Sequence, residues 1–261
     1  MDARALQAFA DQVNRAEPEI DLGRAAAMIA LHDFPNLDLD RVAVVLDTCA
    51  EGVDDLDGLR HRLFAQLGFT GDEVAYYQAD NSFLHRVLER RRGIPITLSI
   101  LTLEVGRRAG VPLEPIAMPG HFLLRDPLAG AYLDPFHGGV LLDLEGCEAV
   151  FRAATGAGPD VPFGDFLLPA VGSLTVLERM LANLAHVYRI NADSEGLEWA
   201  LRLRLALPEV SGQDVVALGE ALADQGRARD GVAELENWAE LSPELGSKLR
   251  LAARGLIARL N

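Results

Sequence analysis

The chain has 261 residues, 49% of them hydrophobic and 24% charged, which is typical of a globular protein and excludes a disordered or collagen-like chain. Its 39 acidic residues outnumber the 24 lysines and arginines, and the formal net charge is −15. This charge opposes binding to nucleic acid or to an anionic membrane surface, since both need a basic face. We therefore expect neither as a partner.

The sequence predicts a protein of the reducing cytoplasm. No basic stretch followed by an apolar run, as in a secretory signal, is visible near Met1, and no apolar run approaches the roughly 20 residues that span a bilayer. Cys49 and Cys147 are the only cysteines, and no Cys/His cluster with metal-ligand spacing occurs. We therefore expect two free thiols, no metal and no cofactor.

Residues 1–92 are predicted to form a helical N-terminal region, because apolar residues recur along them at helical spacing. Asp21 precedes an alanine-rich run, where a helix N-cap is expected. Asn81 and Ser82 are expected to cap the last helix of the region, which ends near Gly93.

Residues 93–152 are predicted to form a core that begins with a longer helix. Pro95 occupies the first turn of that helix, where proline is well tolerated. Apolar residues then follow at helical spacing to Ala109, and Gly110 is expected to end the helix.

Four short strands are predicted after this helix, over residues 114–117, 121–125, 131–134 and 140–142. A turn sequence at 126–130 joins the second strand to the third. If that hairpin is symmetric about Pro127 and Leu128, His121 lies directly opposite Asp134. Because directly opposed residues share a face of the sheet, the register predicts an imidazole next to a carboxylate.

Residues 153–169 contain three glycines and three prolines and are predicted to be a linker. Residues 170–261 are predicted to be helical, and two of their segments end in Pro208 and Pro243, 35 positions apart (243 − 208). This spacing is close to the tetratricopeptide period, so we expect tetratricopeptide-like helical hairpins, with generic antiparallel helices as the alternative.

In the second of these segments Gly231 stands where the repeat usually has alanine, as Gly196 does in the first.

The predicted fold class is α+β. A helical N-terminal region lies on a core with a small antiparallel sheet, and α-helical hairpins follow.

Four short motifs together resemble the SirB family, which joins a helical N-terminal region and a transglutaminase-like, papain-related core to tetratricopeptide-like helices. The motifs are DNSFL at 80–84, RGIPI at 92–96, PGHFLLR at 119–125 and DPF at 134–136. The resemblance covers roughly residues 20–245.

The resemblance also implies the members of a site. In the wider superfamily, a cysteine at the N-terminus of the core helix is the nucleophile, a histidine is the base and an acidic residue orients the histidine. The last two roles fall on His121 and Asp134, with Asn81 and His137 as further pocket residues. Pro95 falls at the nucleophile position, and proline has neither a nucleophilic side chain nor an N–H for an oxyanion.

Thiol chemistry at this position is therefore excluded, and we do not expect an ordinary enzyme. The first hypothesis is a non-catalytic, transglutaminase-like protein that binds a protein or peptide through its helical repeats, its degenerate cleft, or both. The second is an unconventional hydrolase or acyl transferase in which His121 and Asp134 act with water or with Ser99 as the nucleophile. The third is a structural scaffold whose cleft is vestigial.

Overall fold

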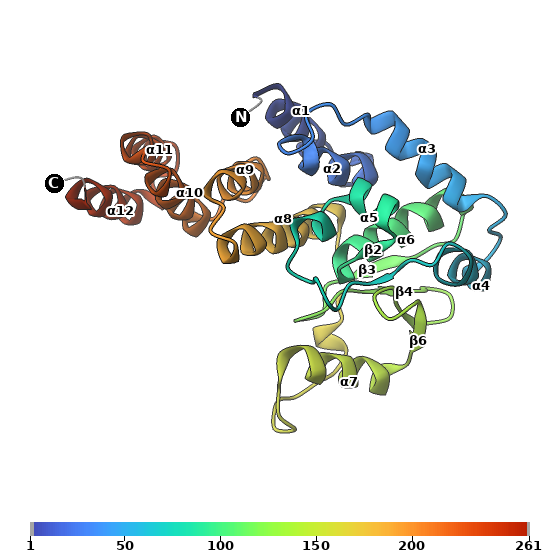
Figure 1. The fold of residues 1–261 in the computed structure, drawn as a ribbon. Helices are drawn as coiled ribbons and strands as arrows, with labels where there is room; N and C mark the ends of the chain where they lie inside the picture. The colour runs from blue at the N-terminus through green and yellow to red at the C-terminus, as the bar shows by residue number, and fades with distance from the viewer. Residues whose placement is uncertain (1–2, 260–261) are drawn as a thin grey trace. The chain divides into compact units, whose positions relative to one another are not determined.

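The computed structural model describes residues 3–259 (Figure 1). Their contacts group the chain into two compact units, which we call the core unit (residues 17–30 and 36–180) and the repeat unit (residues 1–16, 31–35 and 181–261). These units differ from the four segments expected from the sequence, since residues 153–169 lie within the core unit. Over the described residues, no helix has both the length and the apolar character required to cross a membrane.

The core unit contains six α-helices of its own and all the described strands. Its helices are α2 (Leu22–Met28), α3 (Leu39–Ala50), α4 (Leu56–Arg60), α5 (Leu84–Arg90), α6 (Pro95–Ala109) and α7 (Leu144–Thr155). Its strands are β1 (Thr70–Gly71), β2 (Arg92–Gly93), β3 (Glu114–Ile116), β4 (Leu123–Arg125), β5 (Tyr132–Asp134) and β6 (Val140–Leu142). β3 to β6 form an antiparallel sheet in that order, and β1 pairs with β2 in parallel. The predicted α+β fold class is confirmed.

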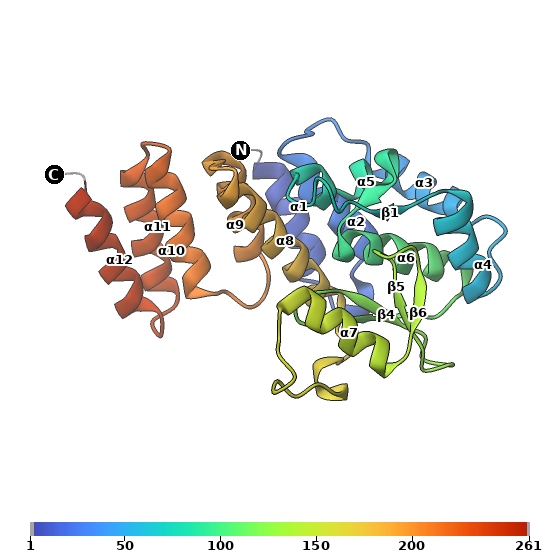
Figure 2. The ribbon, with the colours of Figure 1, turned by 60° about the horizontal axis from the view of Figure 1, so that its bottom comes forward.

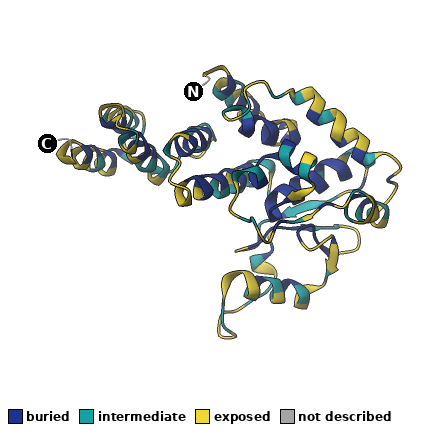
Figure 3. Cartoon of the chain, viewed as in Figure 1, coloured by how far each residue is buried: buried dark blue, intermediate teal, exposed yellow. Residues whose placement is uncertain are grey.

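The sheet lies between α6 and α7 (Figures 1 and 2). Most of α6 is buried, as Figure 3 shows. On the α7 side, Leu123 and Tyr132 of the sheet share an apolar cluster with Cys147. Leu168 is also a buried member of this cluster and Phe163 packs against it, so the segment predicted to be a linker contributes to the core.

The β4–β5 hairpin has a different register from the expected one. Leu124 pairs with Leu133, and the loop is closed by a hydrogen bond from the Asp126 N–H to the Ala131 carbonyl (2.9 Å). Gly130, with a φ of 68°, takes the left-handed conformation that this longer loop requires. The pairing is therefore shifted by two residues, and the prediction that His121 lies directly opposite Asp134 is wrong.

The shift preserves the face that each residue occupies, because side chains alternate along a strand with a period of two. One step beyond the observed pairs, Leu123 comes opposite Asp134. His121 lies two positions before Leu123 and is therefore a diagonal neighbour of Asp134. A long side chain such as that of histidine can still reach across this separation. The contact between imidazole and carboxylate is consequently kept.

The start of α5 also differs from the sequence prediction. Its N-cap is Phe83, whereas Asn81 and Ser82 lie in a preceding 3₁₀ turn, η4 (Ala79–Ser82). The Asn81 side chain does not cap α5, because its amide binds the Ala75 carbonyl and its oxygen accepts from Arg90.

The repeat unit consists of helical hairpins, as predicted. Its helices are α1 (Ala3–Val13), α9 (Ser194–Leu205), α10 (Gly212–Asp224), α11 (Ala228–Leu241) and α12 (Gly246–Arg259), and it shares α8 (Ser173–Ile190) with the core unit. A Cβ atom on Gly231 would lie 2.5 Å from the Gly219 carbonyl oxygen, and one on Gly196 would lie 2.4 Å from the Tyr188 ring. Glycine at these two positions permits the close approach of neighbouring helices.

Candidate functional site

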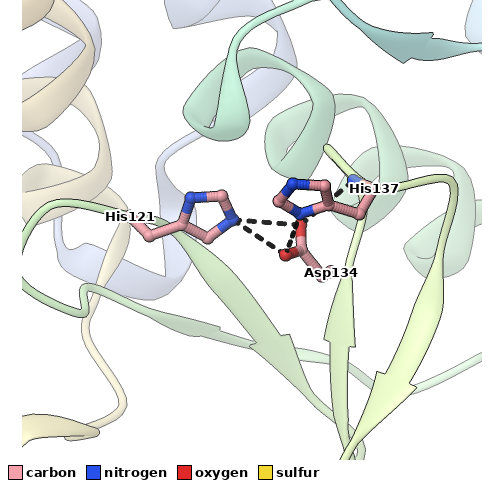
Figure 4. A group of neighbouring side chains, drawn as sticks. All are labelled: His121, Asp134 and His137. Atoms are coloured by element: carbon pink, nitrogen blue, oxygen red, sulfur yellow. Dashed lines mark hydrogen bonds and ion pairs between the residues drawn. The ribbon is translucent and has the colours of Figure 1, made fainter. Parts of the chain in front are cut away.

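Two histidines and an aspartate meet at one end of the four-stranded sheet (Figure 4). Asp134 is the last residue of β5, His121 precedes β4, and His137 lies in the loop after β5. The His121 Nε2 atom is 3.0 Å from both carboxylate oxygens of Asp134, and the His137 Nδ1 atom is 2.7 Å from Oδ2. The side chains of Asp134 and His121 are 0% and 6% exposed, whereas that of His137 is 47% exposed.

The turn after β5 fixes this arrangement. The Asp134 Oδ1 atom accepts hydrogen bonds from the main-chain N–H groups of Phe136 (3.0 Å) and His137 (3.3 Å). Aspartate commonly orders a turn in this way, and Pro135 stiffens it. The turn folds His137 back onto the carboxylate. The sequence signal for this contact is therefore a histidine three residues after the aspartate of an Asp-Pro pair.

The surroundings of Asp134 favour its charged form. Burial opposes ionisation of the carboxyl, but the hydrogen bonds and charges of His121 and His137 outweigh this effect and lower its pKa. The two imidazole rings are stacked, with centroids 5.7 Å apart. The Phe136 ring lies edge-on to both imidazoles, and Tyr76 lies against Phe136. Sequence reasoning did not identify these two aromatic neighbours.

The N-terminus of α6 is tied to the segment that contains Asn81. Pro95 is the first residue of the helix and is buried. The Thr97 hydroxyl accepts a hydrogen bond from the Ile94 N–H (3.1 Å) and donates one to the Asn81 carbonyl (2.8 Å). Asn81, predicted as a pocket residue, is fully buried and has a visible role in holding the start of α6.

Ser99 is not arranged as an activated nucleophile. Its side chain is fully buried, and its Oγ atom has no hydrogen-bond partner among residues 3–259, so it is not bound to His121. The two thiols are buried as well. Burial raises the pKa of Cys49, and burial together with Asp143 and Asp134 raises that of Cys147 to about 12. Neither thiol has the lowered pKa of a catalytic cysteine.

A second feature, which sequence reasoning missed, is a groove in the repeat unit. Three cavities of about 470, 300 and 340 Å³ share Arg202 as a lining residue, and we call them together the Arg202 groove. Trp199, Trp238 and Asn237 also line it. The groove joins helices that are far apart in sequence, so only the fold reveals it.

Charged side chains in the Arg202 groove form a network around Glu198. Glu198 is buried and accepts hydrogen bonds from Arg202 (2.9 Å) and Arg227 (2.7 Å). Arg202 also binds Glu234 (2.8 Å). The charged lining residues are Glu195, Glu198, Asp230 and Glu234 on the acidic side and Arg202 and Arg227 on the basic side.

Sequence comparison supplies relatives for most of the chain. A profile of the transglutaminase-like superfamily matches residues 3–182. A UPF0162 protein of Pseudomonas aeruginosa is 30% identical over 236 residues, which cover 86% of this chain and 82% of the relative. A UPF0162 protein of Xylella fastidiosa is 36% identical over 186 residues, or 65% of each chain. The match therefore spans slightly less than two thirds of the Xylella protein.

A similarity to a eukaryotic protein is more local. F-box only protein 21 of Mus musculus is 39% identical over 139 residues, which cover 49% of this chain but 21% of the mouse protein. No solved structure matches the chain significantly.

Proposed function

The chain belongs to the transglutaminase-like superfamily and to the UPF0162 family, and on that premise we propose that it binds a protein or peptide partner and performs no thiol chemistry. The narrower resemblance to the SirB family stays a prediction. The proposal that thiol chemistry is absent is supported by the place of Pro95 in the first turn of α6 and by the burial of both cysteines.

The single observation that carries the binding proposal is the Arg202 groove. A peptide needs a concave surface with apolar walls and side chains that satisfy its main-chain N–H and carbonyl groups. Trp238 is partly exposed and supplies apolar area. The exposed amide of Asn237 offers both a donor and an acceptor.

The charge of the groove favours a basic peptide. Its lining contains four acidic and two basic residues, and the whole chain has a formal charge of −15. Complementary charge speeds association and helps to select the partner. The affinity for the peptide should accordingly fall as the salt concentration rises.

A selection of random peptides on the full chain tests the proposal. We expect enriched peptides that carry lysine or arginine, and we expect Asn237→Ala to weaken their binding about tenfold in fluorescence anisotropy, as loss of a good hydrogen bond would. Glu236→Ala is the matched control, since Glu236 is exposed on the same helix and does not line the three cavities. Equal binding by the two variants would overturn the assignment to the groove.

A capture experiment with a folded His121→Ala variant separates the groove from the degenerate cleft. If the groove is the binding surface, wild type and this variant should capture the same partner from a lysate of the source cells. Loss of the partner in His121→Ala alone would instead make the cleft the recognition surface.

A second candidate function rests on the half-exposed imidazole of His137. Because Asp134 holds this ring through Nδ1, the pair resembles the aspartate–histidine arrangement of a general base, and water would be the nucleophile. This candidate predicts ester hydrolysis that depends on one ionisation and disappears in His137→Ala. No hydrolysis in a broad ester screen would eliminate it.

A further inference from the structure

We infer that His121, Asp134 and His137 form a binding site for a divalent transition-metal ion, with Zn²⁺ as the best match. The inference goes beyond the proposed peptide binding and does not depend on it. Each residue offers one ligand atom, and the three atoms lie within 4.8 Å of one another. Residue spacing in the sequence predicts no such site, because the fold has to bring His121 to the other two residues.

The chemistry of the donors suits this class of ion. Imidazole nitrogen and carboxylate oxygen are common ligands of Zn²⁺, and two histidines with one carboxylate also hold Fe²⁺ in other proteins. Oxygen-rich sites suit Mg²⁺ and Ca²⁺ better, so a site with two nitrogen donors disfavours those ions. Zn²⁺ has no redox chemistry, so the site needs no redox partner.

The geometry requires little rearrangement. Zn²⁺ holds nitrogen and oxygen ligands at about 2.0–2.1 Å, so neighbouring ligand atoms of a tetrahedral site lie roughly 3.3 Å apart. The Oδ2 atom of Asp134 is 3.0 Å from His121 Nε2 and 2.7 Å from His137 Nδ1. Small rotations of the side chains would open these separations to the required values.

The carboxylate is already oriented for a single bond to an ion. Its Oδ1 atom accepts the main-chain N–H groups of Phe136 and His137, and its Oδ2 atom faces the Nδ1 atom of His137. Hydrogen bonds of this kind around a ligand hold it in place and raise the affinity for the metal. The metal would therefore bind Oδ2, while Oδ1 would keep its main-chain partners.

The site is closed on one side and open on the other. Asp134 and His121 are buried, whereas the His137 side chain is 47% exposed, so an ion can reach the cluster from the side of His137. Three protein ligands leave a fourth tetrahedral position for water or for a ligand. A structural zinc site would instead be filled by four protein ligands.

Metal titration of the chelator-treated full chain tests the inference. We expect calorimetry to show one Zn²⁺ per chain, and Co²⁺ to give the visible absorption of a tetrahedral complex. Loss of an outer partner of a metal ligand already costs about 10–100-fold in affinity. We therefore expect His137→Ala and Asp134→Asn to weaken binding roughly 100-fold or more.

The matched control is His186→Ala, which removes an exposed histidine of the repeat unit and should leave the affinity unchanged. Circular dichroism checks the fold of each variant. If Asp134→Asn does not fold, nitrogen NMR of the wild type still decides, because Zn²⁺ should shift the ring nitrogens of His121 and His137 selectively. The inference is overturned if Zn²⁺ does not bind stoichiometrically, or if His137→Ala binds it with the wild-type affinity. It is also overturned if Zn²⁺ shifts only the ring nitrogens of other histidines.

Discussion

The Thr97 hydroxyl donates a 2.8 Å hydrogen bond to the main-chain carbonyl of Asn81, and this contact joins the first turn of α6 to a segment 16 positions earlier. The same hydroxyl accepts from the Ile94 N–H, so one side chain satisfies two main-chain groups that precede Pro95. Proline fits this first turn because the N–H that it lacks would have no partner within the helix. Thr97 thus takes a large part in holding the N-terminus of α6.

Thr97→Val should destabilise the protein by about 1–3 kcal/mol, because it keeps the shape of the side chain and removes a buried hydroxyl on which two main-chain groups depend. Thr102→Val is the matched control. Thr102 is equally buried in α6, but its hydroxyl only adds a bond to the Leu98 carbonyl within the helix, so we expect a smaller loss. Urea-induced unfolding measures the free energy of unfolding of both variants. Equal losses of stability in the two would argue against the role of Thr97.

Gly231→Ala should destabilise the repeat unit, although alanine is normally the better helix former. The added methyl group would lie 2.5 Å from the Gly219 carbonyl oxygen, so α10 and α11 would have to separate. Gly255→Ala in α12 meets no atom within 4 Å and should instead stabilise the protein by about 0.5–1 kcal/mol. Thermal unfolding should therefore shift in opposite directions for the two variants, and a shift in the same direction would contradict this packing.

The stability of the repeat unit should depend on pH through Glu198. Burial opposes the ionisation of this carboxyl, but Arg202, Gln225 and Arg227 outweigh burial and lower its pKa. The unfolded chain then takes up the proton first as the pH falls. The stabilisation is complete above the unfolded pKa of about 4.3 and is lost as the pH falls through the lower folded value.

Glu198→Gln should accordingly lower the free energy of unfolding by about 1–3 kcal/mol at pH 7 and reduce its dependence on pH below 5. Glu236→Gln, at an exposed position of α11, should retain the wild-type pH dependence. Urea unfolding at a series of pH values measures both variants. An unchanged pH dependence in Glu198→Gln would show that other carboxyls dominate.

Neither cysteine should react quickly in the folded protein. Burial raises the pKa of both thiols, that of Cys147 to about 12, so both are almost entirely protonated at pH 8. We expect a disulfide reagent such as Ellman's reagent to label the native chain at least about 100-fold more slowly than the chain in urea, where both thiols should react. Rapid labelling of one thiol in the native state would contradict the proposal that the chain performs no thiol chemistry.

Several parts of the fold and site were predictable because their causes are local. Pro95 at the start of α6 and Gly110 after its end follow from backbone sterics, and the structure places both as expected. The contact between His121 and Asp134 was predicted from a hairpin register that differs from the observed register by two residues. It is present because an even shift keeps residues on the same face.

The sequence by itself determined the helix that ends at Ala109, the four short strands of the antiparallel sheet, the acidic charge, and the proximity of an imidazole to a carboxylate, because steric limits and hydrophobic period act over a few residues. It did not predict α7 or the pairing of β1 with β2. Only the tertiary structure decided that His137 closes the cluster from its turn, that the Ser99 hydroxyl is buried with no hydrogen-bond partner among the described residues, and that three cavities share Arg202 as a lining residue. These outcomes depend on how distant elements pack, and packing is fixed by the shape and burial of many side chains together.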